Sequence, residues 1–189
     1  MLKDLIHKNR SYRRFKQEVA IDRQTLYELV DLARVSASAA NLQPLKYILS
    51  NEPHKNAIIF QELGWAAYLR DWPGPEESRR PSAYIIILGD KTIAPAFGCD
   101  HGIAAQSILL GATEKGLGGC MIASINSKKL RDSLTIPEKY EILLVIALGK
   151  PAEKVEIETA GAGGSIEYWR DNAGVHHVPK RPLDEIIID

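Results

Sequence analysis

The stretch Asn9-Arg10-Ser11-Tyr12-Arg13-Arg14-Phe15 brings three guanidinium groups and a hydroxyl within five residues. A guanidinium is planar, permanently charged and forked, which suits bidentate contact with a phosphate. If the segment is extended, alternate side chains share a face, so Ser11 and Arg13 point to one side and the other cations to the opposite side. Taken alone, a solvated basic turn is the simpler interpretation, and the rest of the chain must decide.

Length and composition predict one globular domain over residues 1–189, since 45% of the residues are apolar and 25% are charged. The 24 basic and 24 acidic residues cancel, so any anion site must be local, and we expect no nucleic-acid partner. Two distant cysteines without a CxxC pattern predict neither a metal site nor a disulfide scaffold. Residues 1–8 carry charges where a signal peptide is apolar, and no apolar run is membrane-spanning. We therefore expect a soluble, cytoplasmic protein that binds no membrane.

Hydrophobic spacing predicts alternating helices and strands. Leu26, Leu29, Val30 and Ala33 fall at i, i+3, i+4 and i+7, which is typical of a core-facing helix that begins after Asp22. Other helices are expected over residues 2–8, 53–63, 98–115 and 127–134 (the last capped by Ser127), and strands over 45–50, 82–88, 141–148 and 184–188. The elements interleave without strict βαβ periodicity, which favours an α+β fold over a doubly wound sheet.

The segment 98–115 is apolar around nearly its whole circumference. Such a helix is expected to be buried in a core or between subunits. Its small residues would let another backbone approach closely, and Gln106 would need a hydrogen-bond partner if it were buried. Asp100 at its start is explained as a favourable charge near the positive end of a helix.

Several other arrangements argue against familiar catalytic motifs. The loop 116–119 follows a helix, whereas a phosphate-binding Rossmann or Walker loop follows a strand, so the loop offers backbone N–H groups instead. Cys120 or Ser124 with His101 could form a nucleophile–base pair, but no elbow motif surrounds them, and a buried thiol is the better account. The pair His176-His177 is expected to be structural or solvated, because adjacent side chains of a strand face opposite ways.

Two further groups could meet a ligand. Ser38, Asn41 and Gln43 form a compact polar cluster whose amides can donate and accept, which suits a heterocycle with alternating N–H and C=O groups. Satisfaction of a helix end and turn is the alternative. Lys180 and Arg181 form a second local cation cluster, and one phosphate could use both clusters.

Five segments in this order resemble the nitroreductase family of FMN-dependent NAD(P)H oxidoreductases. They are Asn9 to Phe15, Ser38-Ala39-Ala40-Asn41-Leu42-Gln43-Pro44, Asp100 to Gln106, Gly116-Leu117-Gly118-Gly119-Cys120 leading to Ala123-Ser124, and Val178-Pro179-Lys180-Arg181. The resemblance implies an α+β, nitroreductase-like sandwich with a central mixed or antiparallel sheet flanked by helices. It also implies a homodimer with FMN at the interface.

The resemblance also implies roles for these residues. Arg10, Ser11 and Arg13 would hold the phosphate and ribityl end of FMN together with Lys180 and Arg181. Ser38, Asn41 and Gln43 would lie against the flavin from the partner subunit, and a main-chain N–H near Ala123-Ser124 would face flavin N5. No side chain would be catalytic, because the flavin carries the chemistry.

The implied activity is ping-pong hydride transfer through flavin N5, from NADH or NADPH to nitroaromatics, quinones or similar small electrophiles. The alternatives are a non-catalytic FMN carrier or sensor, and an oxygen-dependent or dehalogenating flavoenzyme on the same scaffold. Substrate specificity is expected to lie in the variable excursion 64–81. There Trp65, Tyr68 and Trp72 could either stack on a planar ligand or pack beneath a loop.

Overall fold

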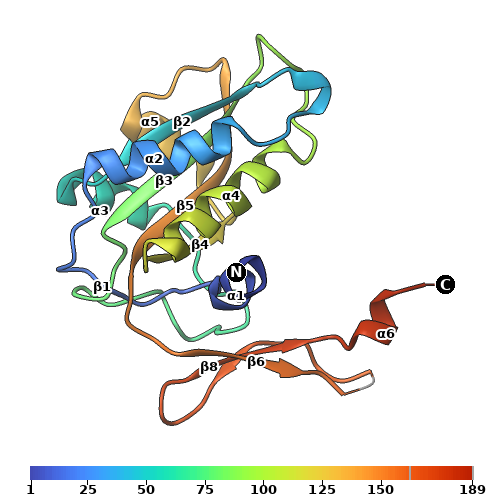
Figure 1. Cartoon of the computed structure of the whole chain (residues 1–189). Helices are drawn as coiled ribbons and strands as arrows, with labels where there is room; N and C mark the ends of the chain where they lie inside the picture. Colours follow the sequence, from blue (N-terminus) through green and yellow to red (C-terminus); the bar gives the residue numbers. More distant parts are fainter. Residues whose placement is uncertain (162, 189) are drawn as a thin grey trace.

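The computed structural model describes residues 1–161 and 163–188, and its centre is an antiparallel sheet (Figure 1). The strand order is β1 (Phe15–Lys16), β5 (Tyr140–Pro151), β3 (Ala83–Asp90) and β2 (Leu45–Ser50), and β4 (Gly118–Ile122) also pairs with β5. Every pairing in this sheet is antiparallel, which confirms the α+β prediction and excludes a doubly wound parallel sheet.

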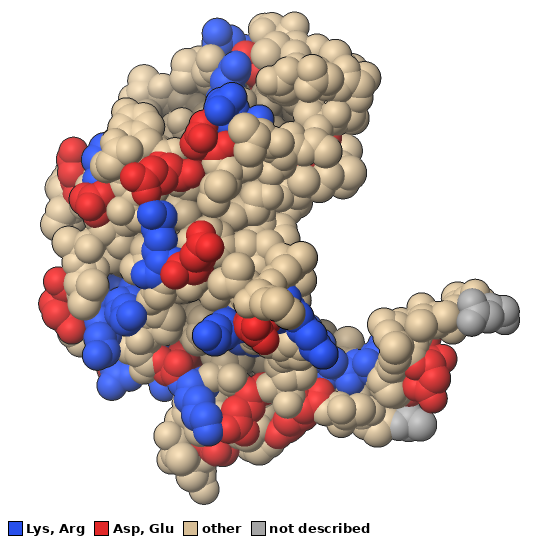
Figure 2. Space-filling model, viewed as in Figure 1, with Lys and Arg blue, Asp and Glu red and all other residues tan. Residues whose placement is uncertain are grey.

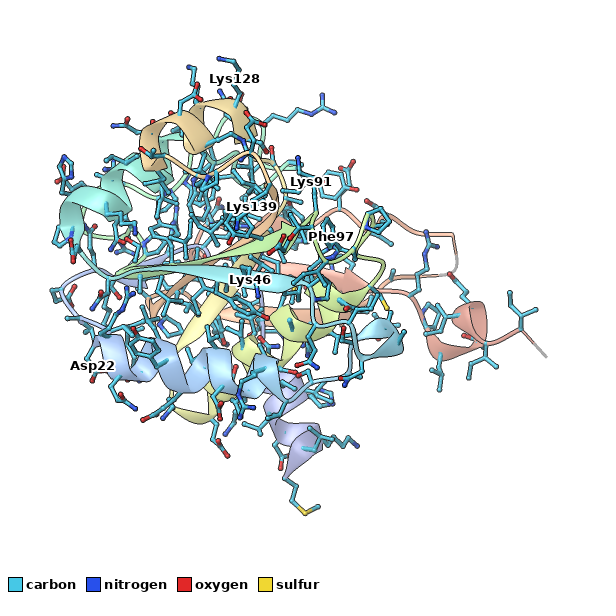
Figure 3. All side chains as sticks on the ribbon, turned by 90° about the horizontal axis from the view of Figure 1, so that it is seen from above. Asp22, Lys46, Lys91, Phe97, Lys128 and Lys139 are labelled. Atoms are coloured by element: carbon cyan, nitrogen blue, oxygen red, sulfur yellow. The ribbon has the colours of Figure 1, made fainter. Side chains whose placement is uncertain are left out.

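Helices cover both faces of the sheet. On one face lie α2 (Arg23–Arg34) and α4 (Asp100–Glu114), and on the other lie α3 (Pro53–Gln61) and α5 (Ser127–Leu134). Seen from above, Asp22 at the start of α2 and Lys128 on α5 stand on opposite sides of the strands (Figure 3). We refer to residues 2–151, which also include the short helix α1 (Leu2–Lys8), as the sandwich.

The two-sided cover explains why β3 reads as an unbroken apolar run. Ile85 and Ile87 belong to the core beneath α2 and α4. Tyr84, Ile86 and Leu88 belong to the second core, beneath α3 and α5. A strand that is buried on both faces has no solvent side to fill with polar residues, so the alternation expected of a half-buried strand is absent.

Capping residues fix where the helices begin. Asp22 accepts a hydrogen bond from the Thr25 amide (2.6 Å) at the start of α2, as the sequence predicts. The prediction that Ser127 caps α5 is wrong, because Asn126 is the capping residue and accepts from the Lys129 amide (3.3 Å). Both residue types are good caps, and the local sequence does not distinguish adjacent candidates.

Helix α4 is buried on one side only. Ala104, Ala105 and Ile108 face the core, whereas Ile103 and Gln106 are exposed in the single chain. The expectation that Gln106 needs a buried partner is therefore not met within one chain. At Gly111 the close neighbour is a side chain and not a backbone, because an added Cβ would lie 2.3 Å from Leu32 Cδ1 of α2.

After β5 the chain leaves the sandwich and forms a separate layer, which we call the C-terminal arm (residues 152–188). It contains a three-stranded sheet in the order β6 (Val155–Thr159), β8 (His176–Lys180) and β7 (Trp169–Arg170), followed by α6 (Leu183–Ile186). Strands β6 and β8 are parallel, and β7 runs antiparallel to β8. Figure 1 shows the arm crossing below the sandwich and ending away from it.

The strand expected over residues 184–188 is wrong, because the structure has the helix α6 there. Two carboxylates, Asp184 and Glu185, fall in its first turn, where the positive end of a helix favours negative charge. Of the expected glycine-rich linker 161–164, residue 162 lies outside the described residues. Across the described part of the chain, no helix is both long and apolar enough to span a bilayer.

Candidate cofactor site

The arginine segment lies directly against the start of β4. Ser11 forms a parallel bridge with Gly119, and the Tyr12 amide donates to the Gly119 carbonyl (3.0 Å). At Gly118 an added Cβ would fall 2.5 Å from Tyr12 Cδ2, so a larger residue would push the segment away. The structure thus brings together two of the segments singled out in the sequence, and a glycine makes their contact possible.

Among the described residues, the guanidinium of Arg13 contacts neutral groups and forms no ion pair. Nη1 donates to the Ser11 carbonyl (3.3 Å) and lies 3.2 Å from His176 Nε2, and the guanidinium carbon is 4.7 Å from the centre of the Tyr168 ring. Arginine has only donors, so His176 Nε2 must act as the acceptor. Burial, reinforced by Arg13 and Arg170, lowers the pKa of His176 to about 4, which keeps the imidazole neutral at ordinary pH.

The neighbouring arginines are held differently. Arg10 Nη2 donates to the Ile6 carbonyl (2.6 Å), and its buried Nε has no partner among the described residues. Arg14 turns toward the Trp72 ring, 5.7 Å from its centre. Arg10 and Arg13 are therefore the cations of this segment that retain unused donors near Ser11.

The polar cluster Ser38, Asn41 and Gln43 is organised by a buried carboxylate. Ser38 Oγ donates to Asp100 Oδ2 (2.6 Å) and accepts from the Gln43 amide (2.9 Å), while Gln43 Nε2 donates to Asn41 Oδ1 (3.1 Å). Ala40, Asn41 and Gln43 all have positive φ, of 49°, 55° and 52°. Non-glycine residues in this conformation persist only where their surroundings enforce it, and they concentrate at functional sites.

Within one chain this cluster lies far from the arginine segment. No hydrogen bond or ion pair joins the two among the residues that the structure describes. In Figure 1 the loop that follows α2 lies at the upper right, whereas α1 and the arm lie at the bottom. Figure 2 shows a hollow on that side of the molecule, between the upper lobe and the arm.

Ala123 and Ser124 follow β4 and are exposed. The Ser124 carbonyl accepts from the Gly64 amide (2.8 Å), and an added Cβ at Gly64 would lie 2.4 Å from Ser124 Oγ. The Ser124 N–H itself makes no hydrogen bond with the described residues. Ser124 therefore lines a surface cavity together with Gly64 and Asn126, and its N–H is available to a ligand.

Lys180 and Arg181 lie at the far end of β8. The Lys180 carbonyl accepts from the Ala160 amide (2.8 Å), and Arg181 Nη1 lies 3.3 Å from Glu185 Oε2. Neither residue contacts Arg10 or Arg13 within the described part of the chain. The other end of β8 supplies the contact with Arg13, through His176.

The aromatic residues of the excursion 64–81 pack rather than form one open platform. Trp65 lies against Phe60, with ring centres 5.5 Å apart. Tyr68 meets the Tyr168 ring edge-on at 4.9 Å. Trp72 lies 4.3 Å from the Arg170 guanidinium, on the side of the arm. Tyr68 is the exposed member of the three, and it is the one next to the residues around Arg13.

The nucleophile and metal alternatives gain no support from the geometry. Cys120 is buried, and burial raises the pKa of its thiol, which disfavours the reactive thiolate. His177 Nδ1 contacts Glu158, and its Nε2 lies 3.3 Å from Asp171, so its ring is occupied by structural partners. Among the residues that the structure describes, no group of three or more potential metal ligands converges.

Comparison with known proteins assigns the family. The model of the nitroreductase family matches residues 6–150, which is most of the chain and nearly all of the sandwich. The chain belongs to the nitroreductase family. The match confirms the resemblance recognised in the five motifs, and its first four segments lie inside the matched range.

Solved structures agree on the nitroreductase-like fold. A nitroreductase family protein from Clostridium novyi NT is 25% identical, with 80% of this chain and 86% of that chain covered and a TM-score of 0.66. An FMN-dependent nitroreductase from Clostridium difficile R20291 is 24% identical, with 79% and 87% covered and a TM-score of 0.66. A nitroreductase family protein from Streptococcus pneumoniae TIGR4 is 17% identical over 100% of both chains, with a TM-score of 0.73. At such low identities the last two show the fold alone.

Three residues around this nitroreductase site make contacts that the sequence does not predict. Asp100 was explained as a helix-end charge, but it also holds Ser38 and the Ala39 amide (3.1 Å). Glu153 accepts from the main-chain amides of both Arg13 and Arg14, and Tyr168 covers the Arg13 guanidinium. Glu153 and Tyr168 lie more than 130 residues from the arginine segment, so no local pattern could have paired them with it.

Proposed function

We propose that this nitroreductase family protein is an FMN-dependent oxidoreductase. It would use NADH or NADPH to reduce nitroaromatics, quinones or similar small electrophiles, as a homodimer with FMN at the interface. The observation that carries the proposal is the guanidinium of Arg13, which contacts neutral groups and no carboxylate among the described residues. Its segment pairs with the glycines at the start of β4. A reaction that draws on NAD(P)H also favours a cytoplasmic location.

The residues present fit the phosphate end of FMN. Among the described residues, Glu153 accepts from the main-chain amides of Arg13 and Arg14 and pairs with the Arg170 side chain, so it leaves the charge of the Arg13 guanidinium available. Arg10 adds a buried Nε that has no partner among the described residues. A dianion would satisfy these donors through charge-assisted hydrogen bonds, each contributing roughly 1.5–3 kcal/mol. Arg10, Ser11 and Arg13 are therefore the proposed phosphate and ribityl contacts.

The reactive end would lie toward Ala123 and Ser124. When bound, FMN supplies the redox chemistry, because its N5 accepts hydride from a nicotinamide and returns it to an acceptor. The free N–H of Ser124 would donate to a ring heteroatom and hold the ring in place. The neighbouring cavity, lined by Gly64, Ser124 and Asn126, would leave room beside the ring for donor and acceptor in turn.

The polar cluster around Ser38 supports a site shared between two copies. Ser38, Asn41 and Gln43 would contact the flavin of the partner subunit, since one chain keeps them away from its own arginine segment. The exposed face of α4 and the apolar residues Leu183, Ile186 and Ile187 of the arm are surfaces that a second copy would cover. Lys180 and Arg181 would complete the phosphate clamp once the arm is enclosed in the dimer.

An absorbance spectrum followed by an anaerobic NAD(P)H titration tests the function. The purified protein should be yellow, or should gain flavin absorbance when FMN is added, and NADH or NADPH should bleach it. Protein that stays colourless with FMN contradicts the proposal. Bound FMN that NAD(P)H does not reduce would instead identify a carrier or sensor, and turnover only with oxygen or halogenated acceptors would identify the other flavoenzyme classes.

Variants of the arginine segment test the phosphate contacts. Arg13→Ala should weaken FMN binding at least about tenfold, because the loss of one charge-assisted contact removes more than about 1.4 kcal/mol. Arg14→Ala is the matched control, since Arg14 faces Trp72 and should change FMN affinity far less. Equal effects of the two substitutions would show that only the general positive charge matters.

Ser124 variants separate main chain from side chain. Ser124→Ala retains the N–H and should change FMN affinity and NAD(P)H oxidation by less than about threefold, whereas Ser124→Pro removes the donor and should be damaging. A strong loss in Ser124→Ala would assign the role to the hydroxyl instead.

A further inference from the structure

The arm contacts the Arg13 side chain through uncharged groups. The guanidinium lies against His176 Nε2 and the Tyr168 ring of the arm, and it donates to the Ser11 carbonyl of its own segment. His176 and Tyr168 both belong to the arm, beyond residues 6–150 that match the family model. The family match therefore says nothing about how Arg13 is positioned from this side.

The carboxylate of Glu153 lies beside the arginine segment but does not pair with the Arg13 guanidinium. Glu153, whose side chain is 1% exposed, uses Oε1 to accept from the main-chain amides of Arg13 and Arg14. Its Oε2 is paired with Arg170 Nη2 (3.0 Å). Glu153 thus fixes the backbone of the arginine segment, while the guanidinium of Arg13 remains without an anionic partner among the described residues.

We propose that His176 is a positioning residue for Arg13: as a neutral, buried acceptor it orients the guanidinium while leaving its full charge to the bound phosphate or flavin. This inference rests on the proposed function of FMN binding. It assigns to the arm a part in building the cofactor site of the chain to which the arm belongs.

The physical reason is that an arginine can be oriented by neutral or anionic partners with opposite consequences. A carboxylate at this place would orient Arg13 equally well but would cancel its charge, so the arginine would attract an incoming anion less strongly. A neutral imidazole accepts one N–H and leaves the positive charge of Arg13 unchanged. Fixing the side chain in advance also reduces the entropy that ligand binding must otherwise overcome.

The tautomer follows from the same contact. Because Nε2 accepts from Arg13, the proton of the neutral ring must sit on Nδ1. His176 is fully buried, and its Nδ1 has no partner among the residues that the structure describes. Besides burial, the charges of Arg13, Arg170, His177 and Arg14 all oppose protonation of the ring, which lowers its pKa.

Three variants of His176, of which His176→Gln and His176→Glu are isosteric, test the inference through FMN affinity, measured by quenching of flavin fluorescence. His176→Gln keeps a neutral acceptor and should stay within about threefold of the wild type. His176→Leu removes the acceptor and should weaken binding about tenfold, the equivalent of one hydrogen bond to a charged group. His176→Glu differs from His176→Gln only in charge and should weaken binding more than His176→Leu does. Thermal unfolding of each cofactor-free variant separates lost affinity from lost folding.

His177→Gln is the matched control. His177 is the next residue of the same strand, but it contacts Glu158 and Asp171, so its replacement should leave FMN affinity unchanged. Equal affinities of the wild type and all His176 variants would overturn the inference while leaving the proposed function intact. So would His176→Glu binding as well as His176→Gln. A wild type that binds no FMN would instead contradict the proposed function itself.

A second readout needs no cofactor. Nitrogen NMR of imidazole-labelled protein should show His176 protonated on Nδ1 and bare on Nε2, and still neutral at pH 5.5. Protonation of Nε2, or titration near pH 6.5 like that of an ordinary histidine, would overturn the inference even if FMN binds.

Discussion

The sandwich and the C-terminal arm are held together by different forces. In the sandwich, two cores of branched side chains fill the space between the sheet and its helices. Among the described residues of the arm, only Ala160 and His176 are buried as whole residues, and Glu153 buries its side chain. The arm is instead fastened by Glu153, by cation–aromatic contacts of Arg13 and Arg170, and by the Tyr68–Tyr168 pair.

This difference predicts that mutations in the sandwich and in the arm affect the protein differently. A core built on apolar area tolerates moderate changes of shape and responds globally to a cavity. An arm fastened by a few buried polar groups depends on each of them, because a buried donor or charge left unpaired costs its full desolvation. The contacts that fasten the arm are also those that organise the arginine segment.

The largest expected effect is on the arm, from Glu153→Ala. The substitution leaves two main-chain amides and the Arg170 side chain without their partner. We therefore expect the free energy of opening the arm to fall by about 3–5 kcal/mol. Native-state hydrogen exchange should show lost protection in β6 and β8 while β3 and β5 keep theirs. Glu156→Ala, which breaks an exposed pair with Lys154, is the control and should cost less than about 1 kcal/mol. Equal loss in arm and sheet would show that the two regions open together.

Next in size is the sandwich variant Ile86→Ala. Ile86 is fully buried in the second core, and its truncation should lower the global free energy of unfolding by about 2–5 kcal/mol. Because the arm docks on the folded sandwich, protection in β3, β5 and the arm should fall together. Urea unfolding with hydrogen exchange checks this, and an arm that kept its protection while the sheet lost it would contradict the proposed dependence.

The sandwich was largely predictable from sequence because its signals are local. The spacing of Leu26, Leu29 and Ala33 determined α2, and unbroken apolar runs marked β3 and β5. The helix α6 was mistaken for a strand because the run Ile186 to Ile188 is β-branched, whereas Pro182 and the acidic first turn favour a helix. Short segments give periodicity too few residues to decide.

The site was predictable only in its recurring motifs. The arginine segment, the Ser38 loop and the glycine loop are recognisable because their residue types and spacing match motifs of the family. Glu153 and His176 gave no such signal, and the motif that begins at Asp100 did not reveal its contact with Ser38. Each of these three residues acts on a partner at least 60 residues away. A glutamate that is buried and binds main-chain amides is recognised only in the tertiary structure, because in the sequence it looks the same as an exposed glutamate.

Acid should weaken the arm before it weakens the sandwich. Burial holds the pKa of His176 at about 4, below the ordinary value of about 6.5 that applies in the unfolded chain. The unfolded state therefore binds the extra proton first, so stability is complete above about pH 6.5 and falls as the pH drops toward 4, by up to roughly 3 kcal/mol. Urea midpoints from pH 7 to 4 should show this slope in the wild type and a shallower one in His176→Gln. An identical slope in the variant would assign the acid sensitivity to other groups.

The smallest expected effect concerns His177, the neighbour of His176 on the same strand, which shifts in the opposite direction. Burial lowers its pKa, but hydrogen bonds to Asp171 and Glu158 outweigh burial and raise it overall. Its contribution is therefore present at low pH and is lost as the pH rises through the raised value. Glu158→Gln should move the His177 pKa down, as NMR titration would show. It should leave His176 neutral and change its pKa much less, because the charge of His177 ranks behind burial, Arg13 and Arg170 among the causes that lower it. Equal shifts of both histidines would mean that the arm responds to pH as one unit and not through two separately placed rings.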